Sequence, residues 1–267
     1  MLSNVPEAFK DFKTVDREHP LALQIRKQIT KALSDFNMLR AGDKLLICAS
    51  GGKDSSILSI LMDEIRKRAP FEFTMQAVLL DQRQPGFDAE RFKTWMAHEN
   101  IPLEIIAKDT YSVVTEKVTN GTFCSLCSKL RRAILYDYAA ANNFTKMALG
   151  HHRDDIIETT LLNLFYSGQL ATMPAKLRSD DKRNVVLRPL AYVAEKDLTE
   201  LSQVWNFPVI PCNLCGSQDG LKRQKMKKLV TELEQQIPNL GGSFLKALEN
   251  AKPSHLLDQK LFNFKDL

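Results

Sequence analysis

The stretch that most constrains the fold is an apolar run that ends abruptly in a glycine turn. Residues 44–49 read Lys-Leu-Leu-Ile-Cys-Ala and predict a buried strand. The next six residues are Ser-Gly-Gly-Lys-Asp-Ser, and an apolar helical face follows at once over residues 55–68. A strand, a glycine turn and a helix start bring backbone N–H groups and the positive end of the helix dipole to one point. This segment therefore predicts an anion site suited to the phosphates of a nucleotide.

The same segment does not match two common nucleotide motifs. A Walker A loop needs Gly where Ile47 stands and Ser or Thr where Asp54 stands, and GxGxxG fails because Gly51 and Gly52 are adjacent. The purely structural interpretation is a strand-to-helix turn capped by Asp54 or Ser55. The flanking serines and the acid favour nucleotide binding instead. The sequence resembles the pyrophosphatase loop (PP-loop) of enzymes that adenylate a substrate and release pyrophosphate.

Strand and helix signals alternate along most of the chain, which predicts an α/β fold with a doubly wound, Rossmann-like parallel sheet and helices on both faces. The expected strands are 44–49, 74–81, 103–107, 145–149 and 184–189. The expected helices are 20–40, 55–68, 88–99, 126–142, 155–167 and 195–205. Ligands of such sheets bind beyond the carboxyl ends of the strands. The glycine turn, Asp81 and Gly150 all end predicted strands, so we expect them to line one cleft.

Three segments are expected along the chain. Residues 1–40 form an N-terminal helical arm, and 41–207 form the ATPase domain with the first cysteine pair. Residues 208–267 form a helical extension with the second pair and a basic helix from about 220 to 237. No apolar run approaches the ~18 residues of a membrane span, and the first residues lack the pattern of a signal peptide. We therefore expect a cytoplasmic protein with no membrane partner.

Positive charge is concentrated in one short run, although the net charge of the chain is only +5. The run consists of Lys222, Arg223, Lys225, Lys227 and Lys228. Basic clusters are the electrostatic footprint of a protein that binds a phosphate backbone. The alternative is a solvated helix face. Beside a nucleotide site, the run favours contact with RNA.

Four of the five cysteines form two CxxC pairs, Cys124 with Cys127 and Cys212 with Cys215. In a chain without an export signal, such pairs favour metal ligation or redox chemistry over disulfides. Residues 128–211 separate the pairs and contain much of the predicted sheet, whereas a zinc ribbon usually has ~15–20 residues between its pairs. The pairs are therefore expected to meet across the fold, beside the cleft. Zinc and iron–sulfur ligation fit this spacing equally well, and a redox dithiol fits it less well.

A second polar segment, Gly-His-His-Arg-Asp-Asp over residues 150–155, follows a predicted strand and opens a helix. Asp154 and Asp155 in a first helical turn are favourable for the helix dipole alone. Beside an ATP site, carboxylates can also hold magnesium, which prefers carboxylate and phosphate oxygens. Both interpretations stay open at this point.

Taken in order, these segments resemble the tRNA 2-thiocytidine synthetases of the PP-loop ATPase superfamily. The resemblance rests on SGGKDS, the strand end Leu79-Leu80-Asp81-Gln82, the first CxxC, GHHRDD, and Pro211 to Gln218 around the second CxxC. It covers nearly the whole chain. It implies an enzyme that replaces the 2-oxo oxygen of cytidine 32 in the tRNA anticodon loop with sulfur. The implied cofactors are ATP, Mg²⁺ and a 4Fe-4S cluster.

The resemblance also implies roles for individual residues. Phosphate binding falls to Ser50, Gly51, Gly52 and Ser55, with Lys53 offsetting charge and Asp54 acting through magnesium. The expected ATP and magnesium site is completed by Asp81, Gly150, Asp154 and Asp155. The cluster ligands are Cys124, Cys127 and Cys212, and Cys215 matches an unligated position, which leaves one iron open for incoming sulfur. The basic run from Lys222 to Lys228 is the expected tRNA contact.

Two alternative functions remain open from the sequence. One is a zinc-containing tRNA-adenylating ligase of the same superfamily, and the other is a zinc-stabilised RNA-binding protein with a vestigial ATP site. The sequence does not identify the sulfur donor, which is either a cysteine desulfurase or sulfide. It is also compatible with a homodimer.

Overall fold

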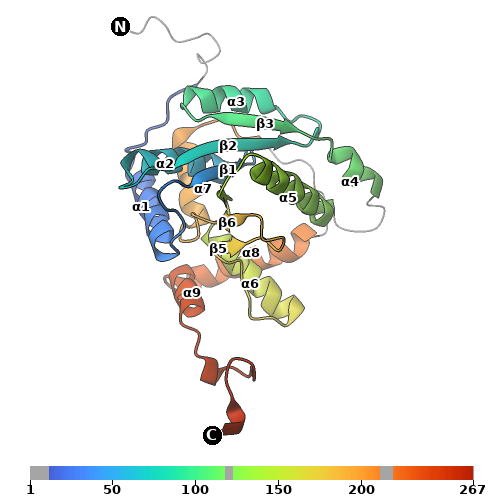
Figure 1. Ribbon diagram of the computed structural model, residues 1–267. Helices are drawn as coiled ribbons and strands as arrows, with labels where there is room; N and C mark the ends of the chain where they lie inside the picture. Colours follow the sequence, from blue (N-terminus) through green and yellow to red (C-terminus); the bar gives the residue numbers. More distant parts are fainter. Residues whose placement is uncertain (1–11, 118–122, 211–218, 267) are drawn as a thin grey trace, which may run out of the picture.

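The computed structural model describes residues 12–117, 123–210 and 219–266, and its centre is a six-stranded sheet (Figure 1). The strand order is β3-β2-β1-β4-β6-β5. The strands are β1 (Lys44–Ala49), β2 (Thr74–Asp81), β3 (Leu103–Ala107), β4 (Lys146–Ala148), β5 (Lys176–Arg178) and β6 (Val185–Leu187). All pairings are parallel except that of β5 with β6. The predicted doubly wound sheet is confirmed, with one antiparallel edge strand too short to leave a sequence pattern.

The helices agree with the sequence pattern at most positions. They are α1 (Pro20–Asp35), α2 (Lys53–Arg68), α3 (Ala89–His98), α4 (Tyr111–Lys117), α5 (Phe123–Ala141), α6 (Arg153–Leu162), α7 (Glu195–Trp205), α8 (Asp219–Gln236) and α9 (Leu240–Glu249). A π-helical turn, Asn163–Ser167, extends α6 and ends at the left-handed Gly168. Helices α4 and α9 were not predicted, and in α9 the pair Gly241 and Gly242 lowers the helical signal.

The apolar run of β1 is continuous because both faces of the sheet are covered. Leu45 and Ile47 belong to a core shared with α1, α2 and α7, whereas Leu46 and Cys48 pack in a second core with α5. Alternate residues of a strand point to opposite faces, so one strand feeds both cores. Burial raises the pKa of the Cys48 thiol to about 12, which makes Cys48 an unreactive core residue.

Helix α1 packs on the same core as the central strands. Its residues Ile25 and Ile29 are fully buried, and the helix contacts α2 and α7. The segment predicted as an N-terminal arm is thus integrated into the sheet domain from residue 20 onward, and residues 1–11 lie outside the described part. In the described ranges, no helix is long and apolar enough to cross a membrane.

The strand order reverses at β1, which pairs with β2 on one side and with β4 on the other. The carboxyl ends of β1 and β4 therefore lie next to each other, and residues 50–55 and Gly150 follow them. This is the position where doubly wound sheets bind ligands. Helices α8 and α9 lie against α6 beside this edge, and the tail after α9 projects away from the body (Figure 1).

Candidate active site

The PP-loop joins β1 to α2 through a backbone that is open to an anion. Gly51 has a φ of +78°, and helix α2 begins at Lys53 with Gly52 as its N-cap. The Ser55 hydroxyl accepts the Ser50 N–H at 3.0 Å, which closes the turn. Asp54 and Ser55 lie inside the helix, so neither is the cap that the structural interpretation required. A helix start without a side-chain cap offers its N–H groups to phosphate.

The loop opens into a cavity of about 430 Å³, within the roughly 300–1,000 Å³ of small-molecule sites. The cavity brings together five of the predicted ATP-site residues: Ser50, Asp54, Ser55, Gly150 and Asp155. Helix α5, β5 and the residue after β6 supply further lining: Ser128, Arg131, Arg132, Leu135, Tyr136, Leu177 and Arg188. Close packing favours glycine at position 150, since a Cβ there would lie 3.0 Å from the backbone nitrogen of Ser55.

Three arginines line this cavity without a counter-charge. Among the described residues, no carboxylate lies within 4.0 Å of the guanidinium groups of Arg131, Arg132 or Arg188. Arg188 is 8% exposed, donates one hydrogen bond to the Pro174 carbonyl, and has an Nε without a partner in the described structure. Burial lowers the pKa of its guanidinium. A buried cation without a carboxylate is costly, so this arrangement suits an anionic ligand.

Sequence reasoning did not single out Arg188 as a site residue. The position of Arg188 near the carboxyl end of the predicted strand 184–189 could have indicated a site residue, because ligands bind at that edge of a parallel sheet. Arg131 and Arg132 of α5 follow the first cysteine pair in the chain, but the sequence does not show that they line the cavity. Their position in the cavity depends on how α5 packs on the sheet.

Asp54 and Lys53 lie at different places relative to the cavity. Asp54 lines it, whereas Lys53 is not among the lining residues and lies between two acids. The Lys53 ammonium is 3.0 Å from Asp54 Oδ1 and 3.6 Å from Glu195 Oε1. The charge-offsetting role expected of Lys53 therefore requires its side chain to leave this pair when phosphate binds.

The two acids at the start of α6 point to different neighbours. Asp155 lines the cavity; its Oδ2 accepts the His152 N–H at 3.0 Å and its Oδ1 accepts from Arg223 at 3.1 Å. Asp154 Oδ2 instead accepts the N–H of Glu195 at 2.7 Å and so caps the first turn of α7. Of the two predicted magnesium residues, the structure thus brings Asp155 to the loop cavity and turns Asp154 away from it.

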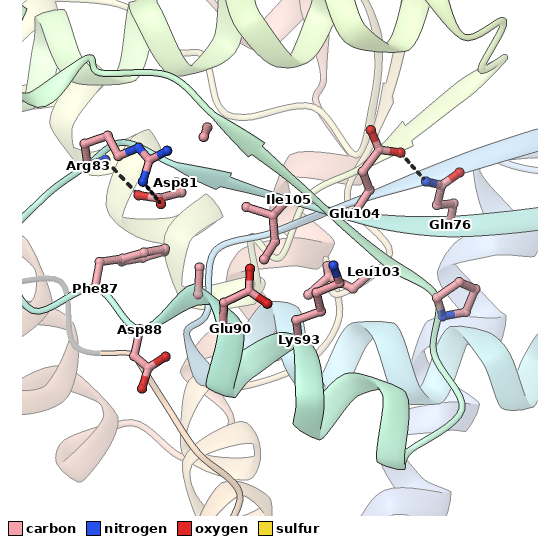
Figure 2. Close-up of a pocket in the computed structure, with 13 residues that line it drawn as sticks. Gln76, Asp81, Arg83, Phe87, Asp88, Glu90, Lys93, Leu103, Glu104 and Ile105 are labelled. Atoms are coloured by element: carbon pink, nitrogen blue, oxygen red, sulfur yellow. Dashed lines mark hydrogen bonds and ion pairs between the residues drawn. The ribbon is translucent and has the colours of Figure 1, made fainter. Parts of the chain in front are cut away.

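Asp81 lies apart from the loop cavity. It borders a different cavity of about 820 Å³ between β2, β3 and α3, and Figure 2 shows it beside Arg83. Asp81 Oδ1 accepts the Arg83 N–H at 2.8 Å, which turns the carboxylate toward its own chain. The expectation that Asp81 and the glycine turn line one cleft is not met, because the backbone of Arg83, two residues after Asp81, binds its carboxylate.

The first cysteine pair lies at the start of a helix, as predicted. Helix α5 begins at Phe123, which places Cys124 and Cys127 one turn apart. The Cys127 thiol donates to Gln82 Oε1 at 3.2 Å, and Gln82 directly follows β2. Cys127 therefore borders the carboxyl edge of the sheet. The Cys124 side chain, Cys212 and Cys215 lie outside the described residues, and no group of three or more His, Cys, Asp or Glu side chains within the described part could hold a metal ion.

The second cysteine segment starts on the PP-loop. Ile210, the residue before Pro211, donates its N–H to the Gly51 carbonyl at 2.9 Å. A Cβ at Gly51 would lie 2.7 Å from Ile210 Cδ1, so only glycine allows this approach. Cys212 is two residues further along the chain. Cys127 and Ile210 therefore both lie at the carboxyl edge of the sheet, while the expectation that the two cysteine pairs meet there concerns residues outside the described ranges.

The five residues of the basic run have different surroundings on α8. Arg223 bonds Glu158 at 2.8 Å as well as Asp155, and Lys227 lies 2.6 Å from Glu195. These two side chains face the acids of α6 and α7. Lys222 and Lys225 are exposed, and Lys225 forms no ion pair with any described residue. Lys228, also exposed, lies 3.8 Å from Glu232 on its own helix.

His151 is a neutral group in the cavity wall. Burial lowers its pKa to about 4, against the opposing charge of Asp155. Its Nδ1 is buried and lacks a hydrogen-bond partner in the described structure. A neutral imidazole with an unsatisfied nitrogen can bind a polar ligand group without adding charge.

An uncapped helix start, unmatched arginines and two cavity carboxylates, at the switch point of a parallel sheet, define a nucleotide-binding α/β protein of the PP-loop class. A family profile described as a PP-loop domain matches residues 21–208. A solved U34-tRNA thiolase NcsA from Methanococcus maripaludis, with its [4Fe-4S] cluster, shares the fold: TM-score 0.70, 19% identity, 87% of this chain and 80% of that chain.

Curated relatives narrow the class to one family. The chain is 60% identical over 253 residues to a tRNA-cytidine(32) 2-sulfurtransferase of Bdellovibrio bacteriovorus, covering 95% of this chain and 98% of the relative. The corresponding protein of Coxiella burnetii is 49% identical over 240 residues, covering 90% and 94%. The chain belongs to the tRNA-cytidine(32) 2-sulfurtransferase family.

Proposed function

We propose that this protein is the ATP-dependent, iron–sulfur-dependent enzyme that converts cytidine 32 of the tRNA anticodon loop to 2-thiocytidine. The observation that carries the proposal is the hydrogen bond from Ile210 to Gly51. That bond holds Ile210, two positions before Cys212 in the chain, against the ATP loop. Activation by ATP and delivery of sulfur therefore share one edge of the sheet.

The chemistry requires activation because the C2 carbonyl oxygen of a pyrimidine is a poor leaving group. The oxygen attacks the α-phosphorus of ATP, pyrophosphate leaves, and the oxygen later departs with AMP when sulfur forms its bond to C2. The N–H groups at the start of α2 would hold the pyrophosphate, and Arg188 and Arg131 would offset the charge that develops on it. Asp54 and Asp155 are the carboxylates placed to hold Mg²⁺.

An iron–sulfur cluster beside this site would be held in part by the start of α5. Cys124 and Cys127 are one turn apart on α5, and the Cys127 thiol reaches the sheet edge at Gln82. Together with Cys212 they would hold the cluster through thiolates, the usual ligands of such clusters. When bound, the cluster supplies a coordination site for the incoming sulfur.

The partners follow from the same proposal. We infer that the substrate is tRNA, that the reaction takes place in the cytoplasm, and that the sulfur comes from a cysteine desulfurase or from sulfide. The protein is compatible with a homodimer. Lys222, Lys225 and Lys228 on the exposed side of α8 remain the proposed tRNA contacts of the basic run, while Arg223 and Lys227 hold the helix in place.

A direct assay tests the proposal. Anaerobically reconstituted protein is incubated with ATP, Mg²⁺, sulfide and tRNA that lacks the modification, and the nucleosides are analysed by mass spectrometry. We expect 2-thiocytidine together with AMP and pyrophosphate, and Asp54→Ala should be folded but nearly inactive. Release of ADP and inorganic phosphate would contradict the adenylation step.

The four paired cysteines separate a cluster from structural zinc. A closed four-thiolate zinc site would make all four equivalent. We expect Cys124→Ser, Cys127→Ser and Cys212→Ser to lose bound iron and thiolation together, while Cys215→Ser keeps the reconstituted iron and sulfide. Metal analysis and the thionucleoside assay measure both quantities. Equal metal loss in all four variants, or stoichiometric zinc in anaerobic protein, would favour the zinc alternatives.

A further inference from the structure

The end of α6 exposes a cluster of large apolar side chains. Phe165 is 56% exposed and Tyr166 is 48% exposed, and Leu164 and Leu170 beside them in the chain are also exposed. Phe165 and Tyr166 lie on the π-helical turn Asn163–Ser167, an irregularity that is often found at functional sites. Neighbouring exposed aromatic residues on one turn indicate a surface that binds something.

A cation lies beside this cluster, and the segment of the cluster carries no acid. Residues 159–179 contain no Asp or Glu, and Lys176 in that segment donates to the backbone carbonyls of Phe36 and Asn37. The Lys222 ammonium lies over the Tyr166 ring, 4.9 Å from its centroid. An aromatic surface with a cation beside it and no acid in its own segment is complementary to a polyanion that has flat apolar groups.

The cluster is connected to the cavity of the active site. The chain after Gly168 returns along α6, where the Thr172 hydroxyl donates to the Ile156 carbonyl at 2.9 Å. It then reaches Leu177, which is exposed and lines the cavity. Phe165 lies ten helical positions beyond Asp155, a distance of roughly 15 Å at 1.5 Å per residue. That separation lets one RNA loop reach both places.

We propose that Phe165 and Tyr166 form a stacking platform for unpaired bases of the tRNA anticodon loop while the target cytidine occupies the cavity. The inference rests on the proposed function and identifies where the loop is held. Proteins recognise RNA loops by stacking unpaired bases on aromatic side chains, with nearby cations that contact the backbone. A protein partner or a second copy of this chain would use the apolar area but would not need the adjacent Lys222 or a segment without acids.

Substitutions that separate an aromatic ring from apolar area test the platform. Binding of an isolated anticodon stem–loop is measured with cluster-loaded protein and with Phe165→Leu, Tyr166→Ala, Phe165→Tyr and Tyr166→Phe. We expect Phe165→Leu and Tyr166→Ala each to weaken binding about tenfold, within the range of base–aromatic stacking. The two variants that keep a ring should bind like the parent. Val204→Ala, at an exposed apolar residue of α7, is the matched control.

Salt dependence and ATP affinity complete the test. The ring variants remove no charge, so the slope of log K against log salt should stay unchanged, whereas Lys222→Gln should reduce it by about one phosphate contact. ATP affinity should be unchanged in every variant.

If the parent protein thiolates tRNA but Phe165→Leu binds the stem–loop normally, the proposed stacking platform is wrong. A changed sedimentation coefficient with unchanged RNA binding would instead assign the surface to contacts between copies. Failure of the parent protein to bind or thiolate tRNA would refute the proposed function itself.

Discussion

Two groups of basic side chains near α6 differ in whether they have acidic partners. In the loop cavity, Arg131, Arg132 and Arg188 have no carboxylate within 4.0 Å in the described structure. Between α6, α7 and α8, by contrast, basic side chains are matched by acids, as in the pairs of Arg153 with Glu234 and Lys227 with Glu195. The difference indicates which cations serve a ligand and which serve the fold.

The matched group holds α8 in position. Arg153 reaches Glu234 at 3.0 Å, and Arg223 reaches Glu158 at 2.8 Å, so two pairs join α6 to α8. Burial raises the pKa of Glu158, and Arg223 opposes that effect. For Glu195, burial acts in the same direction, but hydrogen bonding and charge from Lys227 outweigh it and lower the pKa. Both carboxylates therefore depend on a cation of α8.

The unmatched group behaves as a site prepared for an anion. A buried guanidinium without a carboxylate destabilises the protein when no ligand is bound, and a bound polyphosphate would relieve that cost. Removing such a cation should therefore reduce activity without reducing stability. Removing a matched cation should do the opposite.

The largest effect is expected for Arg188→Met, which removes the charge and keeps most of the apolar stem. We expect thiolation to fall about 10²–10³-fold, as when one donor to a developing charge is lost. The free energy of unfolding without ligand should be unchanged or raised by about 1 kcal/mol. The thionucleoside assay measures thiolation. Thermal unfolding with and without ATP measures the stability of the free protein and its stabilisation by ATP, which should shrink. A clear loss of stability in the ligand-free variant would place Arg188 among the structural cations.

A smaller effect is expected from the neighbouring acids Asp155 and Asp154. Asp155→Asn should reduce thiolation about 10²-fold because it changes a cavity carboxylate that is proposed to hold Mg²⁺. Asp154→Asn should keep most of the activity but lower stability by about 1 kcal/mol, since it alters the cap of α7. Titration of activity with Mg²⁺ should show a raised requirement only for Asp155→Asn. The same raised requirement in Asp154→Asn would mean that both acids serve the metal.

This pair shows what the sequence could and could not predict. The loop, the five predicted strands and the start of α5 at the first cysteine pair follow from apolar runs and helix signals within a few residues. Which of two adjacent acids faces the cavity depends on how α6 docks against α7, which is a tertiary property. The same holds for Asp81, whose carboxylate binds the Arg83 backbone, and for Arg188, whose lack of a carboxylate partner among the described residues is visible only in three dimensions.

Two residues of the basic run test the comparison between basic side chains with and without acidic partners. Lys225→Gln removes an exposed cation that has no ion pair with any described residue, so it should weaken tRNA binding only a few-fold and reduce the salt slope by about one contact. Arg223→Gln breaks the pairs with Asp155 and Glu158, so it should lower the free energy of unfolding by about 1–3 kcal/mol. Equilibrium unfolding and tRNA binding at several salt concentrations measure these effects. Equal salt slopes for Lys225→Gln and the parent would assign Lys225 to a solvated face.

The smallest effect concerns His151, and it appears only below neutral pH. In the unfolded chain, histidine takes up a proton below about pH 6.5, whereas burial holds the pKa of His151 in the folded protein at about 4. The unfolded state therefore binds more protons between these values, and the protein loses stability as the pH falls from 6.5 toward 4, by at most about 3 kcal/mol. His151→Gln cannot take up this proton, so its stability should depend less on pH in that window.

Inorganic pyrophosphate should also reduce the pH dependence of the stability of the parent protein, because an anion beside the three unmatched arginines favours protonation of His151. Equilibrium unfolding at several pH values, with and without pyrophosphate, measures both effects. The same slope in the parent and in His151→Gln would show that the cavity does not oppose a further positive charge.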